Sequence, residues 1–128
     1  MVHRLKLDNL ISFKGYAENI PELLARYDVG ILCSKAEAFG RVTAEYMLAG
    51  LCTVAPLSGA NPEIIADGCG VLYPVGDISS LTRAMREMIE GRIDYIEIGK
   101  KARREAVERF DINKNANKII EYFLQNAK

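Results

Sequence analysis

Residues 29–49 read VGILCSKAEAFGRVTAEYMLA, and this stretch decides the fold that we expect. Its first five residues, 29–33, form a short apolar run that is typical of a buried strand. From Arg41 to Ala49 helix formers dominate, with apolar residues at Val42, Met47 and Leu48. The stretch therefore predicts a strand, a loop and a helix in that order.

The loop before this helix favours an anionic ligand. The first turn of a helix presents unpaired backbone N–H groups and the positive end of the helix dipole, which together suit phosphate. Gly40 lets the backbone approach a ligand closely, and Arg41 adds a positive charge. An exposed dipole contact contributes about 0.3–1 kcal/mol, so we expect it to orient an anion rather than supply all of the affinity.

Two carboxylates, Glu37 and Glu45, stand around this loop with seven residues between them. A carboxylate repels phosphate, so we interpret both as acceptors for sugar hydroxyls, Glu37 beside the loop and Glu45 at a ribose. Hydrogen bonds to a charged group contribute about 1.5–3 kcal/mol each. We expect both side chains to face a common hollow. The alternative is that Glu37 only complements the helix dipole and that Glu45 is a solvated surface residue.

With its surroundings, this segment resembles the E-x7-E motif of the family 4 glycosyltransferases, which are retaining enzymes of the GT-B architecture. The similarity continues through the run from Asp28 to Ser34, through residues 47–50 and 53–55, and through GANPEII at residues 59–65. It ends with residues 67–68 and 70–74 and so covers nearly the whole chain. Ala38 and Ala60 replace residues that are commonly glycine in the family.

The resemblance implies which residues act. Glu37 is the expected catalytic residue, in contact with the sugar, and the backbone from Phe39 to Thr43 is expected to hold sugar and diphosphate. The full set of expected donor-binding residues is Tyr16, Glu37, Ala38, Phe39, Gly40, Arg41, Val42, Thr43, Glu45 and Gly59. Tyr16 or Ala17 would touch the base through main-chain atoms. The nucleoside diphosphate sugar is a substrate, and we expect no cofactor or metal.

At 128 residues the chain has the size of one domain, which we interpret as the latter part of a GT-B C-terminal, donor-binding domain. The acceptor-binding N-terminal domain is expected as a partner, and we expect this chain alone to be inactive. The parent enzyme would transfer a sugar to an acceptor hydroxyl with retention. Two alternatives stay open: a non-catalytic nucleotide-sugar-binding fragment, and a GT-B nucleotide-sugar epimerase relative.

Along the chain, strand-like and helix-like segments alternate, which predicts a Rossmann-like α/β fold with a parallel sheet of about four strands. The expected strands are Asn9–Phe13, Val29–Cys33, Cys52–Ala55 and Gly70–Tyr73. In the family two further strands lie between the first and second of these, so we expect residues 9–13 to close up against residues 29–33. Expected helix caps are Asn19, Asn61, Asp77 and Asp111, with Gly50 ending the helix after the motif.

Composition excludes several classes of protein. Basic and acidic residues number 17 each, so no net field favours nucleic acid. Cys33, Cys52 and Cys69 have no metal-site spacing and fit reduced thiols, and His3 has no catalytic context. No apolar run reaches membrane length and the start lacks a signal-peptide core, which predicts a cytoplasmic location. Contact with the inner membrane face through the full-length enzyme stays open.

The last predicted helix has an apolar side with Ile112, Ile119, Ile120 and Phe123. In the family the terminal helices reach across to the N-terminal domain. Without that partner, we expect this side to be exposed or to pair with a second copy of the chain.

Overall fold

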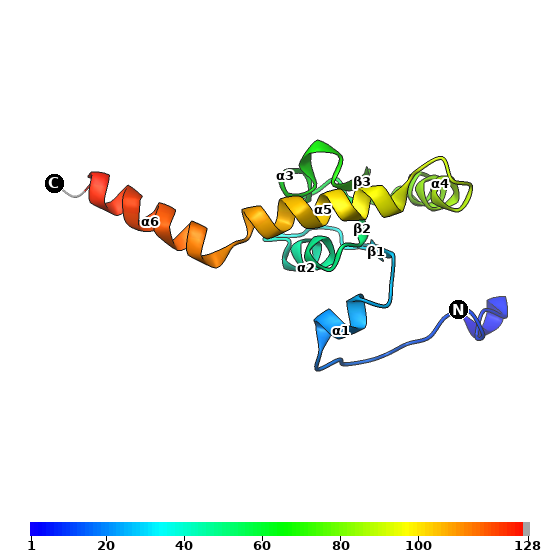
Figure 1. Cartoon of the computed structure of the whole chain (residues 1–128). Helices are drawn as coiled ribbons and strands as arrows, with labels where there is room; N and C mark the ends of the chain where they lie inside the picture. The colour runs from blue at the N-terminus through cyan, green and yellow to red at the C-terminus, as the bar shows by residue number, and fades with distance from the viewer. Residues whose placement is uncertain (127–128) are drawn as a thin grey trace.

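The computed structural model describes residues 1–126, in which helices surround a three-stranded parallel sheet (Figure 1). The elements in chain order are η1 (His3–Leu5), α1 (Ile20–Leu24), β1 (Val29–Ile31), α2 (Arg41–Ala49), β2 (Cys52–Pro56), α3 (Asn61–Ile64), η2 (Ala66–Gly68), β3 (Gly70–Tyr73), α4 (Ile78–Ile89), α5 (Tyr95–Arg109) and α6 (Ile112–Asn126). The predicted α/β class, with a parallel sheet and flanking helices, is confirmed.

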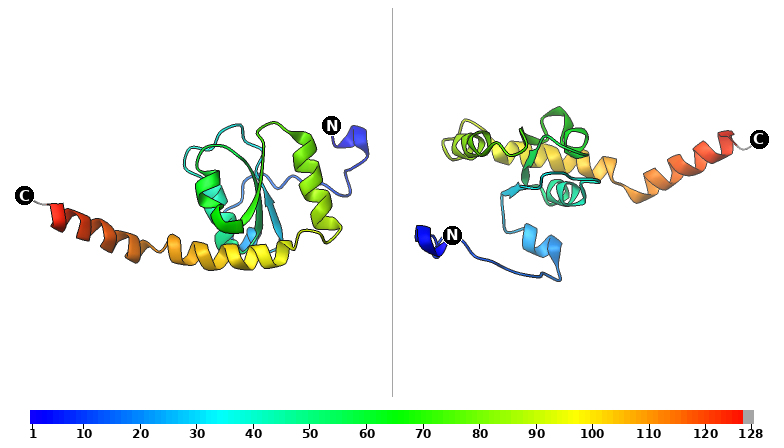
Figure 2. Two further views of the ribbon diagram at one scale, coloured as in Figure 1. Left: turned by 90° about the horizontal axis from the view of Figure 1, so that it is seen from above. Right: turned by 180° about the vertical axis from the view of Figure 1, so that it is seen from behind.

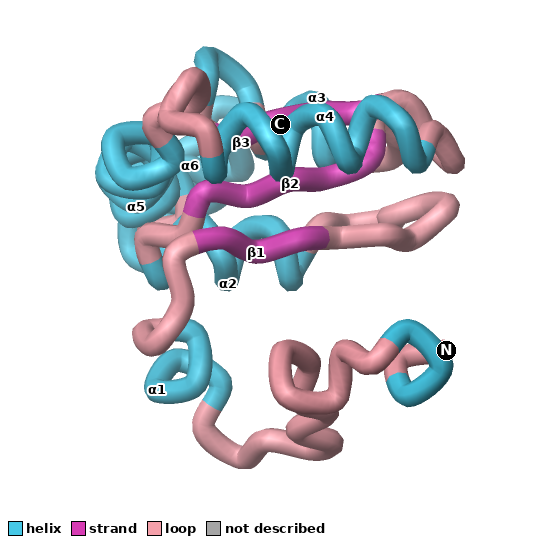
Figure 3. The backbone as a smooth tube through the Cα atoms, turned by 90° about the vertical axis from the view of Figure 1, so that its right-hand side faces the viewer, coloured by secondary structure: helices cyan, strands magenta, loops and turns pink. Residues whose placement is uncertain are grey.

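The sheet has the order β1-β2-β3, and its strands lie side by side as Figure 3 shows. Val29 pairs with Cys52 and Val54 pairs with Val71, both in parallel register. All five residues of β2 are buried, as expected for a strand covered on both faces. Because the strands are parallel, their carboxyl ends meet at one edge, where the loop after β1 begins.

The predicted first strand is wrong, because residues 9–13 do not join the sheet. The backbone N–H groups of Leu10 and Ile11 both donate to the carbonyl oxygen of Leu7 at 2.9 Å, which makes a local turn. An extended segment has no hydrogen bonds of its own and becomes a strand only against a sheet edge. The hydrogen bonds to Leu7 replace pairing with a sheet edge, and the side chains of Leu10 and Phe13 remain exposed.

The helices form layers around the sheet, with α2 and α3 on one side, α4 on the other, and α5 running past the strand ends (Figure 2). One buried cluster joins Met47 of α2, Ile64 of α3 and Ala106 of α5. A second cluster joins Cys52 and Val54 of β2 to Met88 of α4. The structure therefore has two apolar clusters, one among the helices α2, α3 and α5 and one between the sheet and α4.

Short polar side chains begin the helices as predicted at three positions. Asn19 accepts a hydrogen bond from the backbone N–H of Glu22, Asp77 from that of Ser80 and Asp111 from that of Lys114. The hydroxyl and backbone bonds from Ser80 also hold the pKa of Asp77 below its usual value. Gly50, at φ 82°, ends α2 as predicted.

Helix α6 projects away from the sheet (Figure 1) and has no buried residue. Ile112 is 80% exposed and Phe123 is 67% exposed, so the apolar side of α6 is exposed to solvent, as expected. Nothing in the structure tests the expected pairing with a second copy, which stays a prediction.

The packing of α2 onto β1 depends on Gly30, because a Cβ atom at this position would overlap the Tyr46 ring. We expect Gly30→Ala to lower the free energy of unfolding by about 1–3 kcal/mol, the usual cost of overpacking. Urea denaturation measures this loss. In a Tyr46→Ala background, which removes the ring from its Cγ outward, the same change should cost less, and an equal loss in both backgrounds would contradict the contact as its cause.

Candidate functional site

The loop between β1 and α2 carries the predicted motif. Gly40, at φ 76° and ψ 30°, is the residue before the first turn of α2, and its N–H donates to Glu37 Oε1 at 3.2 Å. A Cβ atom at Gly40 would overlap the side chain of Ile64 in α3. Glycine is therefore required here both for the left-handed backbone and for space, and the Glu37 carboxylate lies at the amino end of α2.

The loop before α3 lies against the motif loop. The backbone N–H of Ala60 donates to the carbonyl oxygen of Glu37 at 3.0 Å. A Cβ atom at Gly59 would overlap that same carbonyl group, so only glycine permits the approach. Gly59, predicted as a donor-binding residue, thus has an evident packing role in positioning Glu37.

A buried chain of hydrogen bonds joins α2, α3 and β2. Thr43 Oγ1 donates to Asn61 Oδ1 at 2.7 Å, and Asn61 Nδ2 donates to the carbonyl oxygen of Pro56 at 3.1 Å. Thr43 and Asn61 are both fully buried. The predicted cap at Asn61 is wrong, because Ala60 precedes the helix and the Asn61 side chain turns into the core instead.

Tyr73 holds the end of β1 in place. Its hydroxyl donates to the carbonyl oxygen of Leu32 at 2.7 Å, just before the motif loop begins. Burial, with a smaller contribution from the neighbouring Cys33, raises the pKa of Tyr73. The hydroxyl therefore keeps its proton, and with it this bond, throughout the neutral range.

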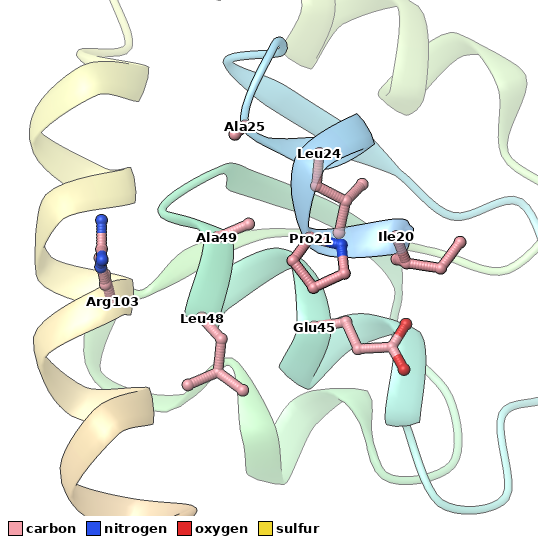
Figure 4. Close-up of a pocket in the computed structure, with 8 residues that line it drawn as sticks. All are labelled: Ile20, Pro21, Leu24, Ala25, Glu45, Leu48, Ala49 and Arg103. Atoms are coloured by element: carbon pink, nitrogen blue, oxygen red, sulfur yellow. The ribbon is translucent and has the colours of Figure 1, made fainter. Parts of the chain in front are cut away.

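Glu45 lines a groove between α1 and α2 with a volume of about 350 Å³ (Figure 4). The groove is mostly apolar, with Ile20, Pro21 and Leu24 of α1 facing Leu48 of α2. Arg41 Nη2 lies 3.9 Å from Glu45 Oε1, one helical turn away, and the Arg41 side chain is 82% exposed. Such a surface pair contributes about 0.3–0.5 kcal/mol, so it leaves the Glu45 carboxylate available to a ligand.

A second cavity, which we call the loop cavity, lies on the α3 side of α2 and has a volume of about 520 Å³. Its lining comes from the motif loop, α2, α3 and the junction of α5 with α6. The residues are Ala38, Phe39, Gly40, Arg41, Ala44, Ala60, Glu63, Ile64, Arg109, Phe110, Asn115 and Lys118.

The predicted site residues are only partly brought together. Residues 38–41 line the loop cavity, Glu45 lines the groove beside α1, and Glu37 lines neither. The expected hollow shared by the two carboxylates is therefore not formed by either cavity. Glu37 is held by the N–H of Gly40, whereas Glu45 lies in the next turn of the helix and faces α1.

Three other predicted site residues have distinct surroundings. Tyr16 is 91% exposed in the segment before α1 and lines neither cavity. Val42 is 37% exposed on the surface of α2. Thr43 is fully buried, with its side chain bonded to Asn61.

Sequence reasoning missed the contribution of Arg109, Asn115 and Lys118 to the loop cavity. These residues lie some 70 positions beyond the motif, and no local pattern places the α5–α6 junction beside it. Within the described residues, no group of three or more His, Cys, Asp or Glu is arranged to hold a metal, and no helix is long and apolar enough to cross a membrane.

The buried Thr43 hydroxyl is expected to act on stability and not on ligand binding. Thr43→Val should lower the free energy of unfolding by about 1–3 kcal/mol, because it leaves the buried Asn61 amide oxygen without its donor. Thr82→Val, on the exposed side of α4, is the matched control and should stay within about 0.5 kcal/mol. Equal unfolding midpoints in urea for the two variants would contradict this role.

Comparisons of the sequence with known proteins all lead to glycosyltransferases. The family described as "Glycosyl transferases group 1" matches residues 1–105. The N-acetyl-alpha-D-glucosaminyl L-malate synthase of Bacillus anthracis is 31% identical over 111 residues, which are 86% of this chain and 29% of that protein. The chain thus spans less than a third of the length of the curated relatives that it matches.

Solved structures agree with this result. Anabaena HepE in complex with UDP is 32% identical, with a TM-score of 0.87 over 97% of this chain and 35% of that chain. The C-terminal domain of the group 1 protein LpcC from Francisella tularensis shares the fold at 23% identity, with a TM-score of 0.74 over 87% of this chain and 59% of that chain. The motif loop, the parallel sheet and the extent of the match lead to one assignment: the chain belongs to the glycosyl transferases group 1 family.

Proposed function

We propose that this chain is the latter part of the C-terminal, donor-binding domain of a retaining family 4 glycosyltransferase. The parent enzyme transfers a sugar from a nucleoside diphosphate sugar to an acceptor hydroxyl. The observation that carries the proposal is the Glu37 carboxylate, which the N–H of Gly40 holds at the amino end of α2, in a chain that belongs to the glycosyl transferases group 1 family. HepE, in complexes with UDP and with UDP-glucose, supports a nucleotide sugar as the donor.

In this proposal each part of the motif has a separate task. Glu37 accepts hydrogen bonds from the transferred sugar, since only its Oε1 atom is engaged by Gly40 in the described structure. The backbone from Phe39 to Thr43 holds the diphosphate at the positive end of α2. Glu45 accepts hydrogen bonds from two ribose hydroxyls at the rim of the groove beside α1.

The helix dipole makes this arrangement catalytic and not only a means of binding. When the bond to the sugar breaks, negative charge grows on the departing diphosphate. Backbone N–H groups that already point at this charge stabilise the transition state more than the ground state. Such an environment requires no reorganisation during the reaction, because α2 is held by its buried bond to α3.

Glu45 is expected to decide ribose binding. Glu45→Gln should weaken the binding of UDP-glucose to this chain about 10-fold or more, since hydrogen bonds to a charged group contribute about 1.5–3 kcal/mol. Glu121→Gln removes an equal charge from exposed α6 and is the matched control. Isothermal titration measures both variants, and equal affinities would contradict the proposed ribose contact.

The stereochemistry tests the retaining class. In the full-length parent, an α-linked donor is expected to give an α-linked product, which proton NMR of the anomeric signal detects. A β-linked product would contradict retention, and epimerised nucleotide sugar without transfer would favour the epimerase alternative.

A binding fragment without turnover is the second candidate, favoured by the separation of the two carboxylates, since neither cavity holds both Glu37 and Glu45. Hydrolysis or transfer by the 128-residue chain alone would rule it out.

A further inference from the structure

Helix α3 holds the motif loop in position from one side. The backbone N–H of Ala60, just before α3, donates to the carbonyl oxygen of Glu37 at 3.0 Å. The side chain of Ile64, the last residue of α3, lies against Gly40, where a Cβ atom would overlap it. The N–H of Gly40 in turn donates to the Glu37 carboxylate at 3.2 Å. The placement of Glu37 therefore depends on where α3 lies.

Helix α3 is too short to keep this position by itself. It has four residues, Asn61–Ile64, which make a single turn. Helices of this length are unstable without contacts to the rest of the protein, because the cost of nucleation is not recovered. The Thr43 hydroxyl holds the start of the turn through Asn61. The end of the turn needs a contact of its own, since the last carbonyl groups of a helix have no partner within it.

Arg109, the last residue of α5, supplies that contact. Its Nη1 donates to the carbonyl oxygen of Glu63 at 2.8 Å and, over a longer distance of 3.5 Å, to that of Ile64. Its Nη2 lies 3.4 Å from Glu63 Oε1, but the Glu63 side chain is 81% exposed, so this ion pair adds little. The hydrogen bonds from the charged guanidinium to the carbonyl oxygens are therefore the main link between α5 and the end of α3.

The surroundings of Arg109 hold its side chain toward α3. The guanidinium carbon lies 5.7 Å from the centre of the Phe110 ring, within the range of a cation–π contact. Asn115 Nδ2 of α6 donates to the carbonyl oxygen of Arg109 at 3.1 Å. Ala106, three residues earlier in α5, belongs with Ile64 to the buried cluster of α2, α3 and α5. The end of α5 is thus fixed where Arg109 can reach α3.

We infer that Arg109 is a positioning residue for the donor sugar. By holding the end of α3, it keeps Ile64 against Gly40 and so fixes the Glu37 carboxylate. This inference rests on the proposed function, in which Glu37 accepts hydrogen bonds from the transferred sugar. Arg109 also lines the loop cavity, but its Nη1 and Nη2 atoms are engaged by Glu63 and not directed to a ligand.

This role predicts a selective effect on the glucose part of UDP-glucose. The ribose is proposed to lie at Glu45, on the α1 side of α2. The diphosphate is proposed to lie at the first turn of α2, which the bond from Thr43 to Asn61 holds. Only the sugar contact of Glu37 depends on the end of α3, so loss of the Arg109 side chain should leave UDP binding nearly unchanged.

The test is isothermal titration of UDP and of UDP-glucose into the wild-type chain and its variants. Arg109→Gln should lower the affinity for UDP-glucose about 3- to 10-fold and that for UDP less than about 2-fold, as loss of a hydrogen bond to a charged group predicts. Arg109→Lys keeps a charged donor for the Glu63 carbonyl oxygen and should recover part of the loss.

The matched control is Lys101→Gln on the same helix. Lys101 also donates to a backbone carbonyl oxygen, that of Asp67 in η2, and lines neither the groove beside α1 nor the loop cavity. Its loss removes a contact of the same kind at a place that does not support Glu37. Lys101→Gln should therefore change neither affinity.

Hydrogen exchange of the Gly40 amide, measured by NMR in the ligand-free chain, follows the positioning directly. Because this N–H is bonded to Glu37, Arg109→Gln should speed its exchange about 10-fold by loosening the loop. Lys101→Gln should leave the exchange unchanged.

Three results would overturn the inference: unchanged exchange of Gly40 in Arg109→Gln, equal effects of the Arg109→Gln and Lys101→Gln variants, or equal weakening of UDP and UDP-glucose. The last result would instead place Arg109 in direct contact with the diphosphate. A wild-type chain that binds neither UDP nor UDP-glucose is a different failure, because it overturns the proposed function, and the role of Arg109 falls with it. If the wild-type chain binds both and Gly40 exchange does not respond to Arg109→Gln, only the role of Arg109 falls.

Discussion

The hydrogen bond between Thr43 and Asn61 is the interaction on which the site depends. It joins α2 to α3 inside the core, and the Asn61 side chain donates a second hydrogen bond to the carbonyl oxygen of Pro56, the last residue of β2. A buried polar group without a partner costs about 1–3 kcal/mol, so each of these groups holds the others in place. The amino end of α2, the loop before α3 and the carboxyl end of β2 therefore behave as one rigid unit.

This unit gives the motif loop its shape. Glu37 is held twice, by the N–H of Gly40 at its carboxylate and by the N–H of Ala60 at its carbonyl oxygen. Both contacts require glycine nearby, since a Cβ atom at Gly40 or at Gly59 would overlap a neighbour. A rigid loop at a helix dipole is suited to charge that develops during a reaction, because its donors are oriented before the substrate arrives.

The site nevertheless has two sides. The groove beside α1 is apolar apart from Glu45 and Arg103, whereas the loop cavity on the α3 side is lined by three positive side chains. Helix α2 and its preceding loop form the wall between them. A ligand that contacts both sides must cross the amino end of α2, where the family motif is located.

Local patterns predicted most elements. The strands β1, β2 and β3 and the helix α2 lie within a few residues of the expected positions, and α1, α4 and α6 begin at expected caps, because apolar periodicity and capping residues act over a single turn or strand. Residues 9–13 carry an equally good strand pattern, yet they stay outside the sheet, and Leu10 and Ile11 bond to Leu7 in a local turn, because a strand needs an edge that only the assembled sheet can offer. Asn61 reads as a cap and lies in the core for a similar reason: its best partner, Thr43, is 18 residues away.

By itself the sequence determined the α/β class, the order of the elements and the two carboxylates of the motif, since each depends on residues that are close together along the chain. Only the tertiary structure decided that Glu37 and Glu45 face different surroundings and that Arg109 and Lys118 approach the motif loop. Those relations depend on how α1 and the α5–α6 junction pack against α2. Such packing is set by contacts between residues far apart in sequence, which no local pattern encodes.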